Sequence, residues 1–382
     1  MNRRAVCRTG PAARFLAAVC ALGFAGGACL AASQPGSGAD SKKAEEARFP
    51  DETWAVRKPE AVGLDGAVLD EVARYLGGRG CVVRRGYLVY GWGDYTRRGD
   101  VASAVKPWYS TFLFKAVEEG RLSSLDTRVA VYVPGLATLN GGKDEAMTFA
   151  HMANQISCYG VAEAPGKAFD YNDWQMALFA DTLFLDVYGA DSWAAVDEEV
   201  LRSRLTGILQ CEDAPTFLAF GLDDRPGRLA VSPRDFARFG LMYLNGGRWR
   251  GRQVIAPEHV KQATRSPLAA ELPRTAGVCA QMLPGQRSIG SREIPDNQTG
   301  HHGSYSWLWW VNGVKRDGKR YWPDAPADVF AALGHANGMR GMAVLPGLEL
   351  VIAWNDTTLG GRPSEPPPVN AVFRLLVKAA GM

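Results

Sequence analysis

Strand-forming patterns lie near both ends of this chain and enclose a long middle segment with helical patterns. Residues 81–93 form two runs rich in Val and aromatic residues joined by a short turn, which is typical of a β-hairpin. Residues 307–311 and 341–354 also have strand patterns, and residues 369–380 form an apolar helical run. A sheet built from both ends of the chain and covered by helices buries all of these runs. The sequence therefore predicts a mixed α/β fold.

The middle of the chain reads as a helical insertion. Residues 137–230 have mainly helical patterns broken by loops, as in the run 174–185. A helix then follows Ser232, which suits an N-cap, with Pro233 at its first position. The polar residues 284–304 are predicted to form a long loop.

The N-terminal segment predicts export. Residues 1–32 have a basic start, an apolar middle and small residues at the end, as in a secretory signal peptide, and no other run is apolar enough to span a bilayer. Residues 33–48 read as a polar tether, and residues 49–382 as the folded domain. Cleavage after residue 32 leaves a soluble periplasmic or extracellular protein, whereas cleavage before Cys29 leaves a lipoprotein with a lipid anchor.

The composition of the chain limits the kinds of binding partner that we expect. The chain is 47% hydrophobic and 22% charged with a formal net charge of +3, which is ordinary for a globular protein and gives no reason to expect nucleic acid as a partner. Neither the cysteines nor the histidines have the spacing of a metal site, so we expect no metal and no cofactor. The four cysteines expected in the mature chain fit either disulfides or buried thiols, and these are Cys81, Cys158, Cys211 and Cys279.

The pair Ser103 and Lys106 is the first candidate for chemistry. Residues three apart on a helix share a face, and a catalytic serine needs a neighbour that takes its proton. The apolar run that follows is predicted to be helical up to Gly120. Because Pro107 is tolerated only in the first helical turn, the helix should begin close to Ser103. We interpret Ser103 as a nucleophile and Lys106 as its base.

Two further clusters of residues, taken separately, are weaker indications of catalysis. Tyr171 and Asp173 lie at a loop-to-helix junction, where a tyrosine beside a cation can exchange protons. The run 334–338 holds His335, Asn337 and Gly338 just before a strand, where backbone N–H groups are able to bind an oxyanion. Asp173 as a helix cap and His335 as a half-buried turn residue are the plain alternatives.

Taken in order, these clusters resemble the three motifs of the penicillin-recognising serine hydrolases. Ser103-x-x-Lys106, Tyr171-x-Asp173 and His335-x-Asn337 resemble the branch that contains class C β-lactamases, D-alanyl-D-alanine carboxypeptidases and esterases. The flanking stretches at 116–126, 147–157 and 232–249 are also similar to this group. The resemblance covers about residues 55–380. It implies a β-lactamase-like fold, with an antiparallel sheet flanked by helices and an all-helical subdomain at about 137–230.

The resemblance also implies catalytic roles. Ser103 would form an acyl-enzyme, and Lys106 would favour ionisation of Ser103 and Tyr171. Tyr171 would pass the proton to the leaving group and later activate water. The oxyanion hole would consist of the N–H of Ser103 and one from the strand at Gly338. The substrate would be a small-molecule or peptidoglycan-like acyl compound.

Two departures from the motifs limit the substrate. Asp173 stands where the family often has Asn, so its carboxylate is expected to pair with Lys106 and hold it charged. His335 stands where β-lactamases have a permanently charged Lys. We therefore expect esterase, amidase or peptidase activity with at most weak β-lactam hydrolysis. The alternative is a catalytically silent ligand-binding or cell-wall-binding protein. Trp174 and Trp309 are candidates for the lining of an aromatic substrate cleft, with burial in the core as the alternative.

Overall fold

The computed structural model describes residues 49–293, 295–296, 298–335, 338–361 and 366–382. The predicted signal peptide, the polar tether, Cys29 and Asn337 therefore lie outside the described residues. Among the residues described, no helix combines the length and the apolar character needed to cross a bilayer.

The architecture is centred on a seven-stranded antiparallel sheet in the order β2-β1-β11-β10-β9-β8-β7. Its strands are β1 (Arg79–Arg84), β2 (Tyr87–Trp92), β7 (Tyr305–Ser306), β8 (Trp309–Val311), β9 (Phe330–Gly334), β10 (Arg340–Leu345) and β11 (Leu350–Asn355). Pairing of β1 with β11 joins the two ends of the domain, as the sequence predicts. The predicted hairpin at 81–93 corresponds to β1 and β2. Strand β9 was not predicted.

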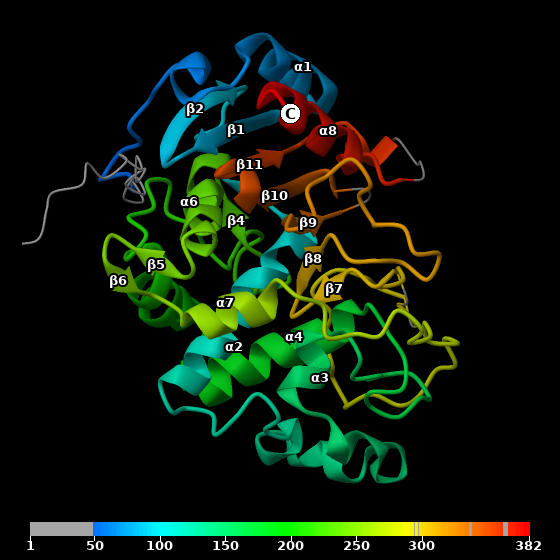
Figure 1. Ribbon diagram of the computed structural model, residues 1–382. Coiled ribbons are helices and arrows are strands. Elements are labelled where there is room, and N and C mark those ends of the chain that lie inside the picture. Colours follow the sequence, from blue (N-terminus) through cyan, green and yellow to red (C-terminus); the bar gives the residue numbers. More distant parts are fainter. Residues whose placement is uncertain (1–48, 294, 297, 336–337, 362–365) are drawn as a thin grey trace, which may run out of the picture. The chain divides into compact units, whose positions relative to one another are not determined.

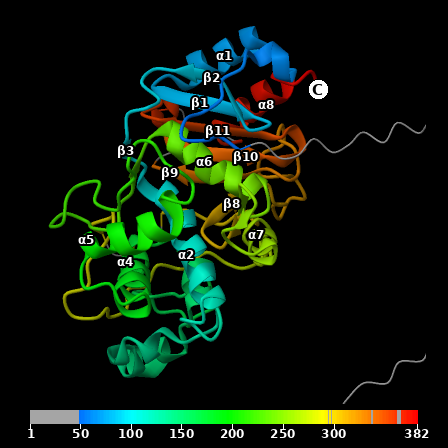
Figure 2. The ribbon, with the colours of Figure 1, turned by 90° about the vertical axis from the view of Figure 1, so that its left-hand side faces the viewer.

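Helices cover both faces of this sheet (Figures 1 and 2). Helix α1 (Gly66–Leu76) and helix α8 (Val369–Ala379) pack together on one face. Helix α6 (Pro233–Leu244) packs against β1, β10 and β11 on the other face. The Ser232 hydroxyl accepts a hydrogen bond from the backbone N–H of Asp235 and caps α6, which confirms the predicted start of this helix. The α+β fold class is therefore confirmed.

The remaining helices lie mostly below the sheet in Figure 1. Helix α2 (Lys106–Glu118) follows a 3-10 turn, η2 (Ala102–Val105), and buries every side chain from Lys106 to Ala116. Helix α4 (Asp173–Asp181) begins after its N-cap Asn172 and continues as a π-helix, so the predicted helix at 174–185 is present. The other helices and strands are α3 (Phe149–Ala153), π-helix η6 (Thr182–Val187), α5 (Trp193–Ala195), π-helix η7 (Val196–Thr206), α7 (Pro257–Ala263), β3 (Gly99–Asp100), β4 (Ala230–Val231), β5 (Arg248–Trp249) and β6 (Arg252–Gln253), with 3-10 turns η1 (Pro59–Val62), η3 (Val129–Val131), η4 (Pro134–Ala137), η5 (Leu139–Ala146), η9 (Pro346–Leu348) and η10 (Leu359–Gly361).

The four cysteines of the domain are free thiols in this structure. Cys81 and Cys158 are buried, Cys211 is half-buried and Cys279 is exposed. Burial raises the pKa of the Cys158 thiol to about 11, so this group stays protonated near neutral pH. Of the two possibilities left by the sequence, the structure has the free thiols.

Candidate active site

A cavity of about 1040 Å³ brings the three predicted motifs together. The motif residues that line it are Ser103, Tyr171, Asp173, His335 and Gly338. They come from the η2 turn, the start of α4 and the turn after β9, which are separate parts of the sequence. The fold therefore brings residues that are far apart in the sequence to one cavity.

The local backbone fixes the position of Ser103. Ala102, just before it, has a left-handed backbone with φ of 50°, which a residue with a side chain seldom adopts. Helix α2 starts three residues after Ser103 with Lys106, and Pro107 is in its first turn, where its missing N–H costs nothing. The Ser103 hydroxyl thus faces the cavity from a tight turn that leads directly into a buried helix.

The end of strand β9 lies directly behind this turn. A Cβ atom on Gly334 would come within 2.1 Å of the Val101 carbonyl oxygen and 3.1 Å of the Ser103 backbone nitrogen. Only glycine allows the strand and the turn to approach this closely. The sheet therefore sets the depth at which the serine stands in the cavity.

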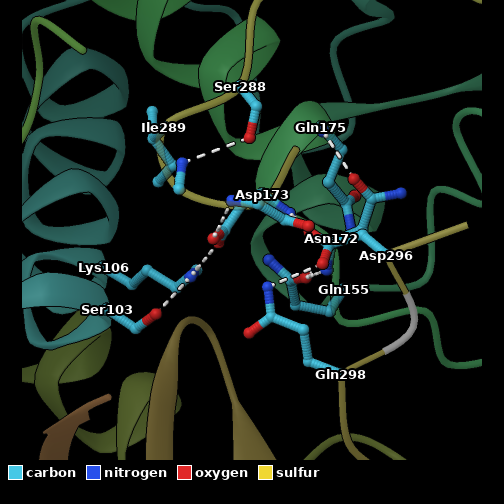
Figure 3. A network of polar contacts seen from close by, with 12 residues as sticks. Ser103, Lys106, Gln155, Asn172, Asp173, Gln175, Ser288, Ile289, Asp296 and Gln298 are labelled. Carbon is cyan, nitrogen blue, oxygen red and sulfur yellow. Dashed lines mark hydrogen bonds and ion pairs between the residues drawn. The ribbon is translucent and has the colours of Figure 1, made fainter. Parts of the chain in front are cut away.

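Lys106 links the first motif to the second (Figure 3). Its ammonium donates to the Ser103 hydroxyl oxygen at 2.9 Å and to Asp173 Oδ1 at 2.8 Å. The Lys106 side chain is 1% exposed and that of Asp173 is 10% exposed. Burial alone would lower the pKa of Lys106, but attraction to Asp173 and Tyr171 outweighs it and raises this pKa. Burial would likewise raise the pKa of Asp173, and the Lys106 charge instead lowers it. Both groups are therefore ionised near neutral pH.

Tyr171 completes the polar centre of the site. The Lys106 ammonium lies 4.4 Å from the centroid of the Tyr171 ring, a distance at which a cation is attracted to an aromatic face. The ring of Trp310 stacks beside Tyr171, with centroids 6.2 Å apart. Ser103, Lys106 and Tyr171 therefore form one group around a single positive charge.

Part of the loop predicted at 284–304 braces the second motif. We call residues 289–298, as far as they are described, the brace. The Asp296 carboxylate accepts the backbone N–H of Asp173 at 2.6 Å, and the N–H of Ser291 donates to Asp173 Oδ2 at 3.3 Å. Gln298 donates its backbone N–H to the Tyr171 carbonyl oxygen at 3.2 Å. The brace thus holds both Tyr171 and Asp173, and Figure 3 shows Asp173, Asp296 and Gln298 of this network.

The third motif lies in the turn between β9 and β10. His335 has a left-handed backbone with φ of 60° and faces the cavity. The Gly338 N–H donates to the His335 carbonyl oxygen at 3.1 Å, and the Gly338 carbonyl accepts from the Trp354 indole at 2.7 Å. The expected oxyanion donor at Gly338 is therefore engaged within the turn. This differs from the expectation, because a left-handed turn directs that N–H back to its own chain.

The two tryptophans expected to bind substrate lie elsewhere. Trp309 is fully buried, and its indole stacks on Phe239 of α6 with centroids 5.8 Å apart. Side chains alternate along a strand, so its neighbour Trp310 points the other way and lines the cavity instead. Trp174 is half-buried outside the cavity lining, and its indole N–H donates to the Glu293 carbonyl oxygen at 3.1 Å. Trp309 is thus a core residue, which corrects the expectation for it.

A second missed feature is a charged cluster on the cavity wall. Asp100 accepts two hydrogen bonds from Arg228, at 3.0 and 2.6 Å, and also pairs with Arg340. Arg228 in addition donates to the Ile289 carbonyl oxygen at 2.8 Å, at the start of the brace. Because Asp100 belongs to β3 and Arg340 to β10, this cluster ties the approach to the nucleophile to the central sheet. These residues match no motif and are spread over the sequence, so no local pattern identifies them.

Among the described residues, no group of three or more His, Cys, Asp or Glu side chains is arranged to hold a metal ion.

Comparison with solved structures defines the fold. The chain is similar to a penicillin-binding protein homologue from Caulobacter crescentus (16% identity, TM-score 0.54, 86% of this chain and 99% of that one). It is also similar to a β-lactamase from Mycobacterium bovis (16%, 0.52, 82% and 100%). A third similar structure, from Bacillus anthracis, is assigned as a 6-aminohexanoate-dimer hydrolase (16%, 0.55, 87% and 87%). No protein-family model matches the sequence, and no curated protein does. The fold is therefore that of β-lactamases and penicillin-binding proteins.

Proposed function

We propose that this protein is an exported serine hydrolase that cleaves an ester, amide or peptide bond through an acyl-enzyme on Ser103. The observation that carries the proposal is the 2.9 Å contact between the Ser103 hydroxyl oxygen and the Lys106 ammonium at the wall of a large cavity. A serine next to a buried cation is favoured in its negatively charged, nucleophilic form. The shared fold supports the proposal, since similar structures include a β-lactamase.

In the proposed reaction, the Ser103 oxygen forms a bond to the acyl carbon and its proton passes to the Tyr171 oxygen, while the Tyr171 hydroxyl gives its own proton to the leaving group. Collapse of the tetrahedral intermediate breaks the bond to the leaving group, which departs with that proton. Water then attacks the acyl-enzyme by the reverse path and releases the acid. The Lys106 charge stabilises negative charge on both oxygens throughout.

Asp173 changes how Lys106 contributes. Because the ion pair keeps Lys106 protonated, Lys106 acts as a fixed positive charge rather than as the first proton acceptor. The proton of Ser103 therefore has to move to Tyr171. This assignment sets aside the interpretation of Lys106 as the base and keeps the pairing with Asp173 that the sequence also suggests.

The substrate is expected to be a linear ester or amide rather than a β-lactam. His335 occupies the position of a permanently charged lysine, and an imidazole, unlike an ammonium group, is not a permanent cation for a substrate carboxylate. The cavity of about 1040 Å³ has room for an extended acyl compound.

The same ion pair favours a second candidate function, a catalytically silent binding protein with this fold. Asp173 and Lys106 neutralise each other inside a buried network, which removes the free base that the sequence motif suggests. A protein of this kind would bind the acyl compound without forming a covalent bond to it.

Acylation of Ser103 separates the two functions. The purified domain is incubated with a fluorophosphonate and, separately, with a fluorescent penicillin, and its intact mass is measured. We expect one adduct per chain with the fluorophosphonate, absent in Ser103→Ala and retained in Ser291→Ala, which removes another serine hydroxyl from the same cavity. Absence of any adduct in the parent protein would support the silent binding protein.

A further inference from the structure

A second hollow lies beside the proposed active site. Its volume is about 530 Å³, and Gln298 and Thr299 of the chain form walls of both hollows. Its other walls include the residues around 270–274 and the hairpin at 314–320, closed by the bridge between Val314 and Arg320. We call this hollow the basic pocket because most of the charged side chains that line it are positive.

The charges that line the basic pocket are mainly positive. Three cationic side chains and one carboxylate line it, and these are Arg274, Lys315, Arg316 and Asp317. The Lys315 ammonium lies 3.7 Å from Asp317 Oδ2, and the lining as a whole keeps a surplus of positive charge. The catalytic cavity differs, since its arginines are offset by the carboxylates of Asp100, Asp173, Glu293 and Asp296. A concave surface with surplus positive charge attracts anions.

Hydrogen bonds hold the walls of the basic pocket in place. Arg316 donates to the carbonyl oxygens of Ala270, Glu271 and Leu272 at 2.7 to 3.0 Å. His301 lies 2.8 Å from the Leu272 carbonyl through Nε2 and accepts the Gly303 N–H through Nδ1, so its ring is neutral. Burial lowers the pKa of His301 in agreement with this. The cations are thus presented by a fixed frame.

A stack of aromatic rings runs from the catalytic centre to the basic pocket. Tyr171 stacks on Trp310, Trp310 on Tyr321 and Tyr321 on His302, with centroids 6.2, 5.7 and 5.6 Å apart. The first three rings line the catalytic cavity, and His302 lines the basic pocket. Together, the three centroid distances correspond to the length of about five residues of extended peptide, at roughly 3.4 Å per residue.

From this arrangement we propose that the basic pocket is a remote subsite for the anionic end of an extended acyl substrate. The substrate class is a peptide-like chain of about five residues with a terminal carboxylate. The reactive carbonyl lies at Ser103, the chain follows the aromatic stack, and the carboxylate binds between Arg274 and Lys315. This inference rests on the proposed function for the fate of the ligand, but the binding itself needs no chemistry at Ser103.

Calorimetric titration of the Ser103→Ala protein tests the subsite without turnover. The two probes are N-acetyl-penta-alanine with a free C-terminal carboxylate and the same peptide as a C-terminal amide. We expect the acid to bind about fivefold more tightly than the amide, and the preference to fall as salt screens the charges. Lys315→Gln should reduce the preference to about twofold or less.

Lys319→Gln is the matched control, since it removes the same charge from the exposed part of the same hairpin, outside the pocket lining. It should retain the full preference for the acid. Equal binding of acid and amide, no binding of either peptide, or an equal loss in Lys319→Gln would each overturn the subsite. Failure of Ser103 to be acylated in the parent protein would instead refute the proposed function and leave this binding result unchanged.

Discussion

The Lys106 ammonium contacts Ser103 and Asp173, and these two contacts depend on different parts of the fold. On one side, Ser103 lies three residues earlier in the chain, on the same turn, and helix formation alone brings the two groups together. On the other side, Asp173 is placed by the brace, whose Asp296 lies 123 residues further along the chain. The first contact is a property of a short sequence, whereas the second depends on the complete fold.

This difference separates two kinds of contribution to the site. The local side supplies the reacting atom, and the remote side sets the charge of Lys106 by holding the carboxylate beside it. If this division is correct, changes on the local side should abolish the reaction. Changes on the remote side should reduce the rate or move its pH dependence.

The largest effect is expected for Lys106→Ala. Hydrolysis of a p-nitrophenyl ester should fall by about 10³-fold or more, because the positive charge next to Ser103 is lost. The domain should also lose about 3 to 5 kcal/mol of unfolding free energy, because Asp173 is left buried and unpaired. Denaturant unfolding measures this loss.

The double variant Lys106→Ala/Asp173→Asn is the control for Lys106→Ala. It should recover most of the stability and none of the activity, since it removes the unpaired charge but supplies no cation. Activity close to that of the parent in either variant contradicts the assignment of Lys106.

A moderate effect is expected for Asp296→Ala in the brace. Loss of the hydrogen bond to the Asp173 backbone should let the start of α4 shift and reduce kcat by about tenfold with little change in KM. Glu293→Ala is the matched control, because it removes another carboxylate of the same cavity from the same loop. Equal losses in both variants would mean that charge in the cavity, and not positioning by the brace, controls the rate.

The smallest effect is expected for Asp173→Asn and concerns pH. Asp173 raises the pKa of Lys106, and burial opposes this, so removing the carboxylate should lower that pKa. Lys106 then loses its proton at lower pH, and the limb of the rate profile that reports this loss should move to lower pH by about one unit. Asp181→Asn, at the far end of the same helix, should leave the profile of kcat against pH unchanged. An unshifted profile in Asp173→Asn would mean that loss of the Lys106 proton does not control the rate.

Local signals explain which parts of the fold were predictable. The cap at Ser232 and the hairpin of β1 and β2 are encoded within a few residues, and the structure confirms both. Strand β9 was missed because its five residues, Phe330–Gly334, have no regular polar alternation and gain their pairing from β8 and β10. The expectation that Trp309 lines the cleft is wrong because nothing in the sequence indicates which face of β8 meets α6. Its neighbour Trp310 lines the cavity instead.

The candidate site divides in the same way. The motifs contain Ser103, Tyr171 and His335, which the fold brings to one cavity. The brace residue Asp296 and the cluster around Asp100 act through tertiary contacts, so their roles follow only from the three-dimensional arrangement.

The two walls of the cavity differ in how easily they can move, because Gly334 packs tightly against the turn that holds Ser103. On the sheet side there is no clearance behind Ser103, since even a methyl group on Gly334 would collide with the backbone. On the opposite side, the second motif is held by single hydrogen bonds from the brace. A bulky ligand that presses on both walls should therefore displace the brace first. The serine would keep its position while the charge environment of Lys106 adapts to the ligand.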